Sequence, residues 1–364
     1  DPLWSRGLGD VYKRQNLLYA SWNLMKQESA APTTQLIDVD GKVSRVPPPL
    51  GSKPLLIFLV IGETARAADF ELLGHVRPTN PKLSGVGDLY LFNEMSSCGT
   101  STAISLPCIF SGLGREKFEV ANATNRTNLL DTLTKGGIAV EWRDNNSGCK
   151  GICARVPAVA MQAEVTPLLC QEDYCHDEIL LSGLSKSITD NPVDQLKVLH
   201  QIGSHGPAYW RRYPASFEYF KPTCRTTNLG ACSLDEIHNA YDNTVRYTDH
   251  VLSKMIEMLQ DLSDRYDTVF IYVSDHGESI GENGLYLHGA PYYFAPDMQT
   301  RIPMLLWMSE GYRQRKNIQS SCVQSLRNLP FSHDNIYHTV LGMADIKNAF
   351  YNSTLDILKV CRPL

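Results

Sequence analysis

The sequence lacks any apolar run long enough to cross a membrane. The longest run, Leu55–Ile61, is far shorter than the ~20 residues that a transmembrane helix needs. The first residues do not join a basic stretch to an apolar one, so they predict no signal peptide. Internal repeats and low-complexity tracts are also missing. We therefore expect a globular chain with no membrane span of its own.

An excess of positive charge is missing as well. The chain carries 34 Lys and Arg against 39 Asp and Glu, which gives a net charge of −5. This balance argues against a nucleic-acid-binding protein. With 364 residues, 43% of them hydrophobic and 20% charged, the chain has an ordinary globular composition. It is long enough for one large α/β domain or two smaller ones.

Cysteine, by contrast, is plentiful. Eight of the ten cysteines form four close pairs: Cys98/Cys108, Cys149/Cys153, Cys170/Cys175 and Cys224/Cys232. Short, local spacing predicts disulfide bonds in an oxidising compartment. Cys322 and Cys361 remain, and a fifth bridge between them is a secondary expectation. The alternative is a structural zinc site, since the second and third pairs have ligand-like spacing. Disulfides are favoured because four separate pairs exceed the needs of one zinc ion.

The chain divides into three parts. Residues 1–15 fit no amphipathic period and are compatible with a vector or assembly scar. Residues 16–50, which include Pro47–Pro49, read as an extended linker. From residue 51 to 364, strand and helix signals alternate. This alternation predicts an α/β domain with a mainly parallel central sheet and helices on both faces.

Individual elements of this domain can be predicted. Strands are expected at Leu55–Ile61, Ile138–Trp142, Leu196–Ile202, Thr268–Val273 and Met304–Trp307, and helices at Asn128–Lys135 and from Ser233 to about Leu262. Ser233 and Glu236 form a capping box at the start of the long helix. The segments 143–193 and 206–232 are expected to be long loops that their cysteine pairs hold in place.

Metal-ligand side chains recur after the predicted strands. Asp275 and His276 directly follow the strand at 268–273, Glu63 follows the first strand, His205 follows the third, and His288 lies further on. A single Glu or His at such a place is more often structural. Because the carboxyl ends of parallel strands share one edge of a sheet, however, the five predict a site for one or two metal ions. Histidine mixed with carboxylates suits zinc better than magnesium.

Two hydroxyl- and amide-rich segments could bind a phosphoryl group. Ser97–Ala103 precedes a predicted short helix, whose N-terminus attracts anions. A metal-activated hydroxyl there becomes a nucleophile, and a Cys98–Cys108 bridge would fix Thr102 in place. Simple N-capping is the alternative. Arg143–Ser147 with Lys150 offers donors to phosphate oxygens, or forms an ordinary turn.

Together these motifs resemble the alkaline phosphatase–sulfatase superfamily. Within it, the chain resembles the phosphoethanolamine transferases of Gram-negative bacteria, which include lipid A-modifying and mobile colistin-resistance enzymes. The matching stretches are Gly62–Ala67, Ser97–Ala103, Trp142–Ser147, His205–Tyr209, Ser274–Ser279 and Gly281–Gly284. The resemblance covers roughly residues 50 to 345, and the motifs are specific because they occur together and in order.

The resemblance implies a role for each residue. It makes Glu63, Thr102, Asp275 and His276 the primary zinc ligands, with Thr102 as nucleophile and Thr100 as its competitor. His205 and His288 would bind a second zinc ion or the substrate phosphate. Asn146, Ser147, Lys150 and Glu278 would line the substrate pocket, together with the same two histidines.

The resemblance also implies an activity and a location. The expected reaction moves phosphoethanolamine from phosphatidylethanolamine to a lipid A phosphate through a covalent threonine intermediate, which gives polymyxin (colistin) resistance. Family members carry an N-terminal transmembrane domain that this sequence does not show. Residues 51–364 are thus expected to be a monomeric catalytic domain at the periplasmic face of the inner membrane.

Two other functions remain open on the sequence. A soluble phosphatase or phosphodiesterase of the same superfamily would use the same residues but pass the intermediate to water. A non-catalytic ligand-binding pseudoenzyme would keep the site without turnover. A sulfatase is disfavoured, because the sequence has no Cys/Ser-x-Pro-x-Arg motif.

Overall fold

A computed structural model describes residues 36–362, apart from 124, 164–167 and 172. Residues 1–15, and the linker as far as residue 35, lie outside the described residues. The chain from Asp38 onward belongs to one compact unit. Among the described residues, no helix combines the length and apolarity that crossing a membrane requires.

The centre of the unit is a seven-stranded sheet with the order β3-β13-β10-β2-β9-β5-β6. Its strands are β2 (Leu55–Gly62), β3 (Leu89–Phe92), β5 (Ala139–Asp144), β6 (Ala158–Ala160), β9 (Gln195–His200), β10 (Asp267–Ser274) and β13 (Met304–Met308). The pairs from β10 through β2, β9 and β5 to β6 are parallel. The predicted mainly parallel sheet is therefore confirmed.

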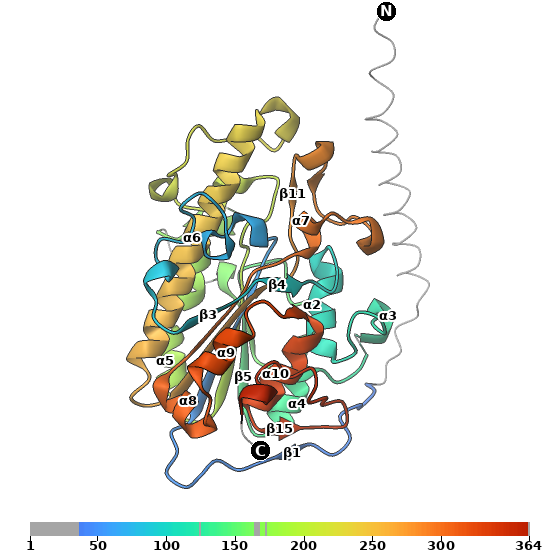
Figure 1. The fold of residues 1–364 in the computed structure, drawn as a ribbon, viewed down its shortest axis with the longest axis vertical. Helices are drawn as coiled ribbons and strands as arrows, with labels where there is room; N and C mark the ends of the chain where they lie inside the picture. Colours follow the sequence, from blue (N-terminus) through green and yellow to red (C-terminus); the bar gives the residue numbers. More distant parts are fainter. Residues whose placement is uncertain (1–35, 124, 164–167, 172, 363–364) are drawn as a thin grey trace, which may run out of the picture. The chain divides into compact units, whose positions relative to one another are not determined.

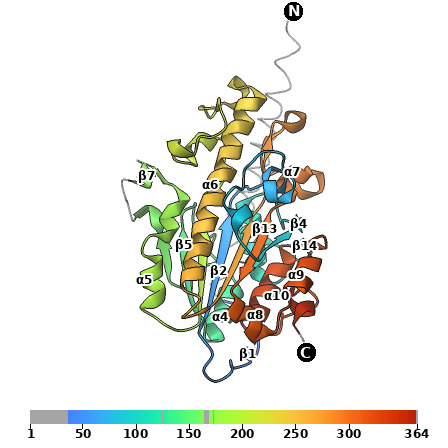
Figure 2. The same cartoon turned by 60° about the vertical axis from the view of Figure 1, so that its left-hand side comes forward.

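Helices cover both faces of this sheet, as predicted (Figures 1 and 2). Side chains of β2 alternate between two apolar cores: Leu55, Ile57, Leu59 and Ile61 enter one, and Leu56, Phe58 and Val60 the other. The first core is closed by α2 (Thr102–Ser111), α4 (Leu129–Lys135) and α10 (Asp334–Met343), and the second by α6 (Leu234–Asp261). A strand buried on both faces reads as a continuous apolar run, which explains the sequence of β2.

The structure corrects two expectations about secondary structure. The predicted strand β13 runs antiparallel to β10, and β3, which the sequence pattern did not reveal, adds a second antiparallel edge. The segments 143–193 and 206–232 are not bare loops. They contain β6, β7 (Cys170–Gln171), β8 (Tyr174–Cys175), α5 (Leu184–Thr189) and 3-10 turns such as η6 (Tyr209–Arg211). These elements are too short to leave a periodic pattern in the sequence.

The remaining elements are short. They are β1 (Ser44–Arg45), β4 (Glu94–Ser96), α3 (Val120–Ala123), β11 (Ser279–Ile280), β12 (Tyr286–Leu287), α7 (Asp297–Thr300), α8 (Glu310–Lys316), α9 (Ser320–Ser325), β14 (Pro330–Ser332) and β15 (Ile346–Lys347). The 3-10 turns η9 (Glu282–Gly284) and η10 (Tyr292–Phe294) bear on the site described below. The capping box of Ser233 and Glu236 starts α6 as predicted.

The predicted linker overlaps the compact unit over residues 38–50. There β1 pairs antiparallel with β15. The fully buried Asp40 accepts hydrogen bonds from Thr132 Oγ1 at 2.6 Å and from Lys135 Nζ at 2.9 Å. This stretch is thus attached to the domain by a strand pair and a buried carboxylate.

All ten cysteines form disulfide bonds. The predicted pairs are confirmed, including the secondary expectation at the C-terminal end: Cys98–Cys108, Cys149–Cys153, Cys170–Cys175, Cys224–Cys232 and Cys322–Cys361. The alternative of a cysteine zinc site is therefore wrong, because no thiolate is left to bind a metal. The first of these bonds joins the turn before α2 to the body of that helix.

The bonds Cys149–Cys153 and Cys224–Cys232 hold irregular segments together. The second cysteine of each bond, Cys153 and Cys232, is half-buried. Cys153 lies in the turns that follow β5, and its backbone N–H donates to Cys149 Sγ at 3.1 Å. Cys232 ends the 3-10 turn η8 (Leu229–Ala231), directly before the N-cap of α6. Neither Cys153 nor Cys232 belongs to a group of possible metal ligands among the described residues. Each is joined to the start of its segment by a disulfide bond.

Candidate metal-dependent active site

Three predicted metal ligands meet at the carboxyl edge of the sheet. β2 and β10 are parallel neighbours with Gly62 opposite Ser274, so Glu63 and Asp275 leave the sheet side by side. Glu63, Asp275 and His276 are fully buried. One ligand atom from each lies within 4.8 Å of the other two. His276 Nε2 is 3.4 Å from both Glu63 Oε1 and Asp275 Oδ2.

The hydrogen bonds of this cluster leave one face of it unsatisfied. Glu63 Oε2 accepts from Asn146 and Thr102, and Asp275 Oδ1 accepts from the backbone N–H groups of Thr64 and His276. The other two oxygens, Glu63 Oε1 and Asp275 Oδ2, are buried with no hydrogen-bond partner among the described residues. Buried carboxylate oxygens without a partner are costly, and a cation between them would compensate both.

The protonation of His276 also fits a metal ligand. Its Nδ1 donates to the carbonyl oxygen of Gly277 at 2.8 Å, which leaves the lone pair of Nε2 facing the two carboxylates. Burial lowers the pKa of His276. Burial raises the pKa of Glu63 and of Asp275, and the charge of Asp275 raises that of Glu63 further. The residues present therefore fit a divalent cation, whose charge would favour the ionised carboxylates.

Thr102 is the hydroxyl that reaches this cluster. It is the first residue of α2, after the N-cap Ser101, and is only partly buried. Its Oγ1 donates to Glu63 Oε2 at 2.9 Å and lies 3.4 Å from His276 Nε2. Thr100 Oγ1 instead donates to the carbonyl oxygen of Ala290 at 2.6 Å. The geometry thus distinguishes the two threonines, which the sequence alone left as competitors.

A buried histidine that the sequence did not single out supports the turn before Thr102. His333 Nδ1 accepts from the backbone N–H of Cys98 at 2.9 Å, and Nε2 donates to the carbonyl oxygen of Ser274 at 2.8 Å. Burial lowers the pKa of His333 to about 3, so the ring is neutral and keeps this donor and acceptor pattern. It connects the turn before Thr102 to the end of β10.

A second polar group adjoins the first. The ring of His288 lies 4.4 Å from that of His276 and 5.6 Å from that of His205, between ring centroids. His288 Nδ1 is 2.6 Å from Glu278 Oε2, and Tyr209 donates to Glu278 Oε1 at 2.7 Å. Burial lowers the pKa of His288, but the bond to Glu278 and nearby carboxylates outweigh it, and the net shift is upward. Both predicted histidines therefore lie next to the three-ligand cluster.

The predicted substrate residues divide into two kinds. The buried Asn146 donates to Glu63 Oε2 at 2.7 Å and to the carbonyl oxygen of Gln201 at 2.8 Å, so it holds a candidate metal ligand in place. Ser147 is exposed, and Lys150 Nζ bonds its hydroxyl at 2.8 Å. The turn rests on Asp144, which bonds the backbone of Asn146 and the ring of His200.

Arg66 is another residue that the sequence analysis missed, although it lies in the Gly62–Ala67 motif. Its buried guanidinium pairs with Asp69 at 2.6 Å and with Glu282 at 2.7 Å. Glu282 belongs to η9, between Glu278 and His288. Arg66 thus connects the loop that carries Glu63 to the segment that carries the second polar group.

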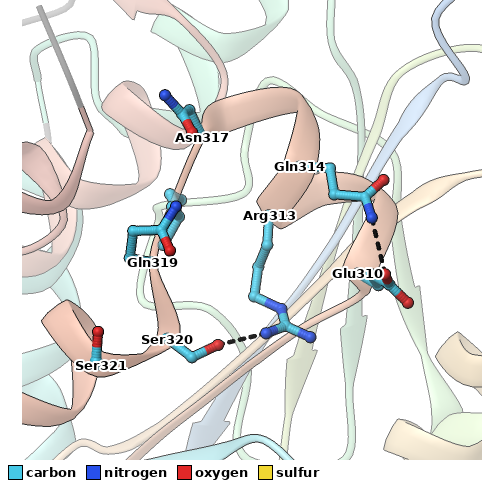
Figure 3. A pocket seen from close by; sticks show the side chains of 8 residues that line it. Glu310, Arg313, Gln314, Asn317, Gln319, Ser320 and Ser321 are labelled. Atoms are coloured by element: carbon cyan, nitrogen blue, oxygen red, sulfur yellow. Dashed lines mark hydrogen bonds between the residues drawn. The ribbon is translucent and has the colours of Figure 1, made fainter.

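A separate hollow lies away from this site. It has a volume of about 570 Å³ and opens beside α8 and α9, with Arg313 bonded to Ser320 across it (Figure 3). Because Met308 at the end of β13 lies opposite Val269 near the start of β10, α8 follows at the other edge of the sheet from Glu63 and Asp275. We assign the chemistry to the cluster at the carboxyl edge.

The fold and the site define the class of protein. The family model described as Sulfatase matches residues 56–346, and the chain belongs to this family. Its fold is that of the alkaline phosphatase–sulfatase superfamily, with a mainly parallel central sheet and helices.

Individual relatives of known reaction class are similar to this chain over most of its length. The phosphoethanolamine transferase EptA of Salmonella typhimurium is 42% identical over 351 residues, which are 96% of this chain and 64% of the relative. The phosphatidylethanolamine transferase Mcr-1 of Escherichia coli is 37% identical over 327 residues, 88% of this chain and 59% of the relative. The soluble domain of lipooligosaccharide phosphoethanolamine transferase A from Neisseria meningitidis matches with a TM-score of 0.87 at 42% identity, covering 91% of this chain and 99% of that one.

These comparisons confirm the resemblance to phosphoethanolamine transferases. The chain spans less than two thirds of the length of the two curated relatives, 64% and 59%. It matches nearly the whole of the Neisseria soluble domain.

Proposed function

We propose that this chain is the catalytic part of a zinc-dependent phosphoethanolamine transferase. The donor is phosphatidylethanolamine and the acceptor is a phosphate of lipid A. The observation that carries the proposal is the contact of the partly exposed Thr102 hydroxyl with Glu63, beside two buried carboxylate oxygens that have no partner among the described residues. The relatives EptA and Mcr-1, which are phosphoethanolamine and phosphatidylethanolamine transferases, support this reaction class.

The metal follows from the donor set. Glu63, Asp275, His276 and Thr102 would hold one zinc ion, and His205 and His288 would hold a second ion or the substrate phosphate. When bound, zinc favours the alkoxide form of the threonine and neutralises charge on the phosphoryl oxygens.

The residues of the chain account for two half-reactions. Thr102 Oγ1 loses its proton and attacks phosphorus; a new P–O bond forms, the bond to diacylglycerol breaks, and the leaving oxygen takes up a proton. An oxygen of a lipid A phosphate then attacks the same phosphorus; a new P–O bond forms, the bond to Thr102 Oγ1 breaks, and Oγ1 takes up a proton again. The N–H groups at the start of α2 face the transferred anion, and the histidine rings flank it.

Location and consequence belong to the same proposal. Five disulfide bonds suit an oxidising compartment such as the periplasm. There the monomeric domain would act at the outer face of the inner membrane, joined to an N-terminal membrane domain. Adding a cationic ethanolamine to lipid A phosphates would weaken polymyxin binding and give colistin resistance.

The test is to trap the covalent intermediate. The zinc-loaded protein is incubated with a short-chain phosphatidylethanolamine, and its intact mass is measured. We expect an increase equal to one phosphoethanolamine group in the unaltered protein and in Thr100→Ala, and none in Thr102→Ala. An adduct of equal yield in Thr102→Ala would refute the assignment of the nucleophile.

The superfamily offers one close alternative, a phosphodiesterase or phosphatase. The partial exposure of Thr102 would admit water as readily as a lipid phosphate. The two reactions are separated by following a labelled ethanolamine. Label on lipid A supports the transferase, and label released as free phosphoethanolamine in the presence of lipid A supports the hydrolase. A purified protein that binds no metal would instead support the pseudoenzyme.

A further inference from the structure

Two large aromatic side chains stand almost free in solvent next to the proposed site. Tyr293 is 91% exposed and Phe294 is 79% exposed, whereas most aromatic side chains of the described residues are buried. Their rings contact each other edge to face, with centroids 5.2 Å apart. They belong to η10, which follows His288 and precedes α7. Adjacent exposed aromatic side chains are typical of an interaction surface.

The segment just before this aromatic pair is hydrogen-bonded to the turn before Thr102. The backbone N–H of Gly289 donates to the carbonyl oxygen of Thr100 at 2.8 Å, and Thr100 Oγ1 donates to the carbonyl oxygen of Ala290. The hydroxyl of Tyr292 donates to the carbonyl oxygen of Ser97 at 2.8 Å. These bonds fix the segment against the turn just before Thr102. Whatever the aromatic pair contacts is therefore brought to the rim of the site.

We propose that Tyr293 and Phe294 insert into the interface of a phospholipid bilayer and bring the site to the level of the lipid headgroups. This inference rests on the proposed function, because both proposed substrates keep their acyl chains in a membrane. Aromatic rings favour the zone between headgroups and acyl chains. A loop that is already hydrogen-bonded to the body of the domain loses less conformational freedom when it inserts than a free loop would.

Neighbouring side chains fit the same surface. The guanidinium of the exposed Arg115 stacks over the ring of Tyr292, 4.5 Å from its centroid, and can pair with a lipid phosphate. The segment with β11 and α7 lies at the opposite end of the sheet from β1 and β15 (Figure 1).

The first experiment measures binding of the whole chain to vesicles of phosphatidylethanolamine and phosphatidylglycerol by co-sedimentation. Replacing both rings, in Y293S/F294S, is expected to weaken partitioning of the chain onto vesicles. The expected loss is about tenfold or more for each ring that would insert into the bilayer. The matched control is Leu50→Ser, since Leu50 is fully exposed but precedes β2 at the opposite edge of the sheet. Unchanged binding of Y293S/F294S, or an equal loss in Leu50→Ser, would overturn the proposal.

A second readout covers the case in which the double variant disturbs the loop. Tyr293→Trp places a reporter in the segment, and its fluorescence is expected to be quenched by vesicles of brominated phosphatidylcholine. Absence of quenching refutes insertion. Because neither measurement depends on turnover, failure of the transfer reaction itself is distinguished: Thr102→Ala is expected to bind vesicles like the unaltered chain. Self-association of the unaltered chain, abolished in Y293S/F294S without any vesicle binding, would assign the pair to a dimer instead.

Discussion

Replacing Asp275 by asparagine is expected to affect the metal-free and the zinc-loaded protein in opposite directions. In the metal-free protein, Asp275 and Glu63 are two fully buried carboxyls whose pKa values are raised by burial. Asparagine keeps the Oδ1 acceptor for the N–H groups of Thr64 and His276. Its amide nitrogen replaces the unpartnered Oδ2, 3.4 Å from His276 Nε2, and can donate to that lone pair.

The expected magnitudes follow from these contacts. A buried polar group without a partner costs about 1–3 kcal/mol, so metal-free Asp275→Asn should be as stable as the unaltered protein or about 2 kcal/mol more stable. Zinc at a hundredfold excess over its Kd should stabilise the unaltered protein by about 2.7 kcal/mol. The variant loses an anionic ligand and should gain almost nothing from zinc.

Urea unfolding with EDTA and with added zinc checks both signs, and calorimetry gives the zinc affinity. Asp190→Asn is the matched control, because Asp190 lies in an exposed ion pair with Lys186, which contributes less than about 1 kcal/mol. Destabilisation of metal-free Asp275→Asn by more than about 2 kcal/mol would refute the account of the buried carboxylates. Equal stabilisation by zinc in variant and unaltered protein would refute the ligand assignment.

Further predictions concern the groups that support the site. The pKa of Asp144 is lowered to about 2, because its bonds to His200, Trp142 and the backbone outweigh the effect of burial. The ionised carboxylate therefore stabilises the fold by about 2 kcal/mol at pH values above its unfolded pKa. This stabilisation is lost as the pH falls from about 4 to 2. Asp144→Asn should flatten acid unfolding over that range, and a curve parallel to the unaltered protein's would contradict this. His333→Ala should slow adduct formation on Thr102 at saturating donor by about tenfold or more, since the turn loses its tie to β10; an unchanged rate in a folded variant would show that the tie does not position Thr102. Arg66→Met leaves two carboxylates unpaired and should lower the free energy of unfolding by about 3–5 kcal/mol. The control Arg211→Met breaks the partly exposed pair with Asp173 and should change the free energy of unfolding by less than about 1 kcal/mol. Equal losses in the two variants would contradict the role of burial.

From the sequence alone, we could predict those candidate site residues that follow directly after a strand. Asp275-His276-Gly277 after an apolar run is a local signal of a metal ligand pair, and Glu63 shows the same signal after β2. The roles of Asn146 and His333 carry no such signal. Their side chains act through residues far along the chain, since Asn146 bonds Glu63 and His333 bonds Cys98. Such contacts depend on how the elements pack.

For the fold as well, elements with a local sequence signal could be predicted and elements that depend on packing could not. Continuous apolar runs and the capping box of α6 are encoded over a few residues, and these elements were predicted within a few residues of their ends. The antiparallel direction of β13 and the existence of β3 were not. An edge strand of four residues with only alternate side chains buried has too short a pattern to stand out.

By itself, the sequence determined which residue types follow the predicted strands, five of the seven strands of the central sheet and which cysteines pair. Only the tertiary structure decided that β2 and β10 are neighbours in register, so that Glu63 meets Asp275 and His276. It also decided that Thr102, and not Thr100, faces that cluster. The reason is physical: residue types and short periods are local properties of a chain, whereas strand order, register and the direction of a hydroxyl follow from burying both faces of one sheet at once.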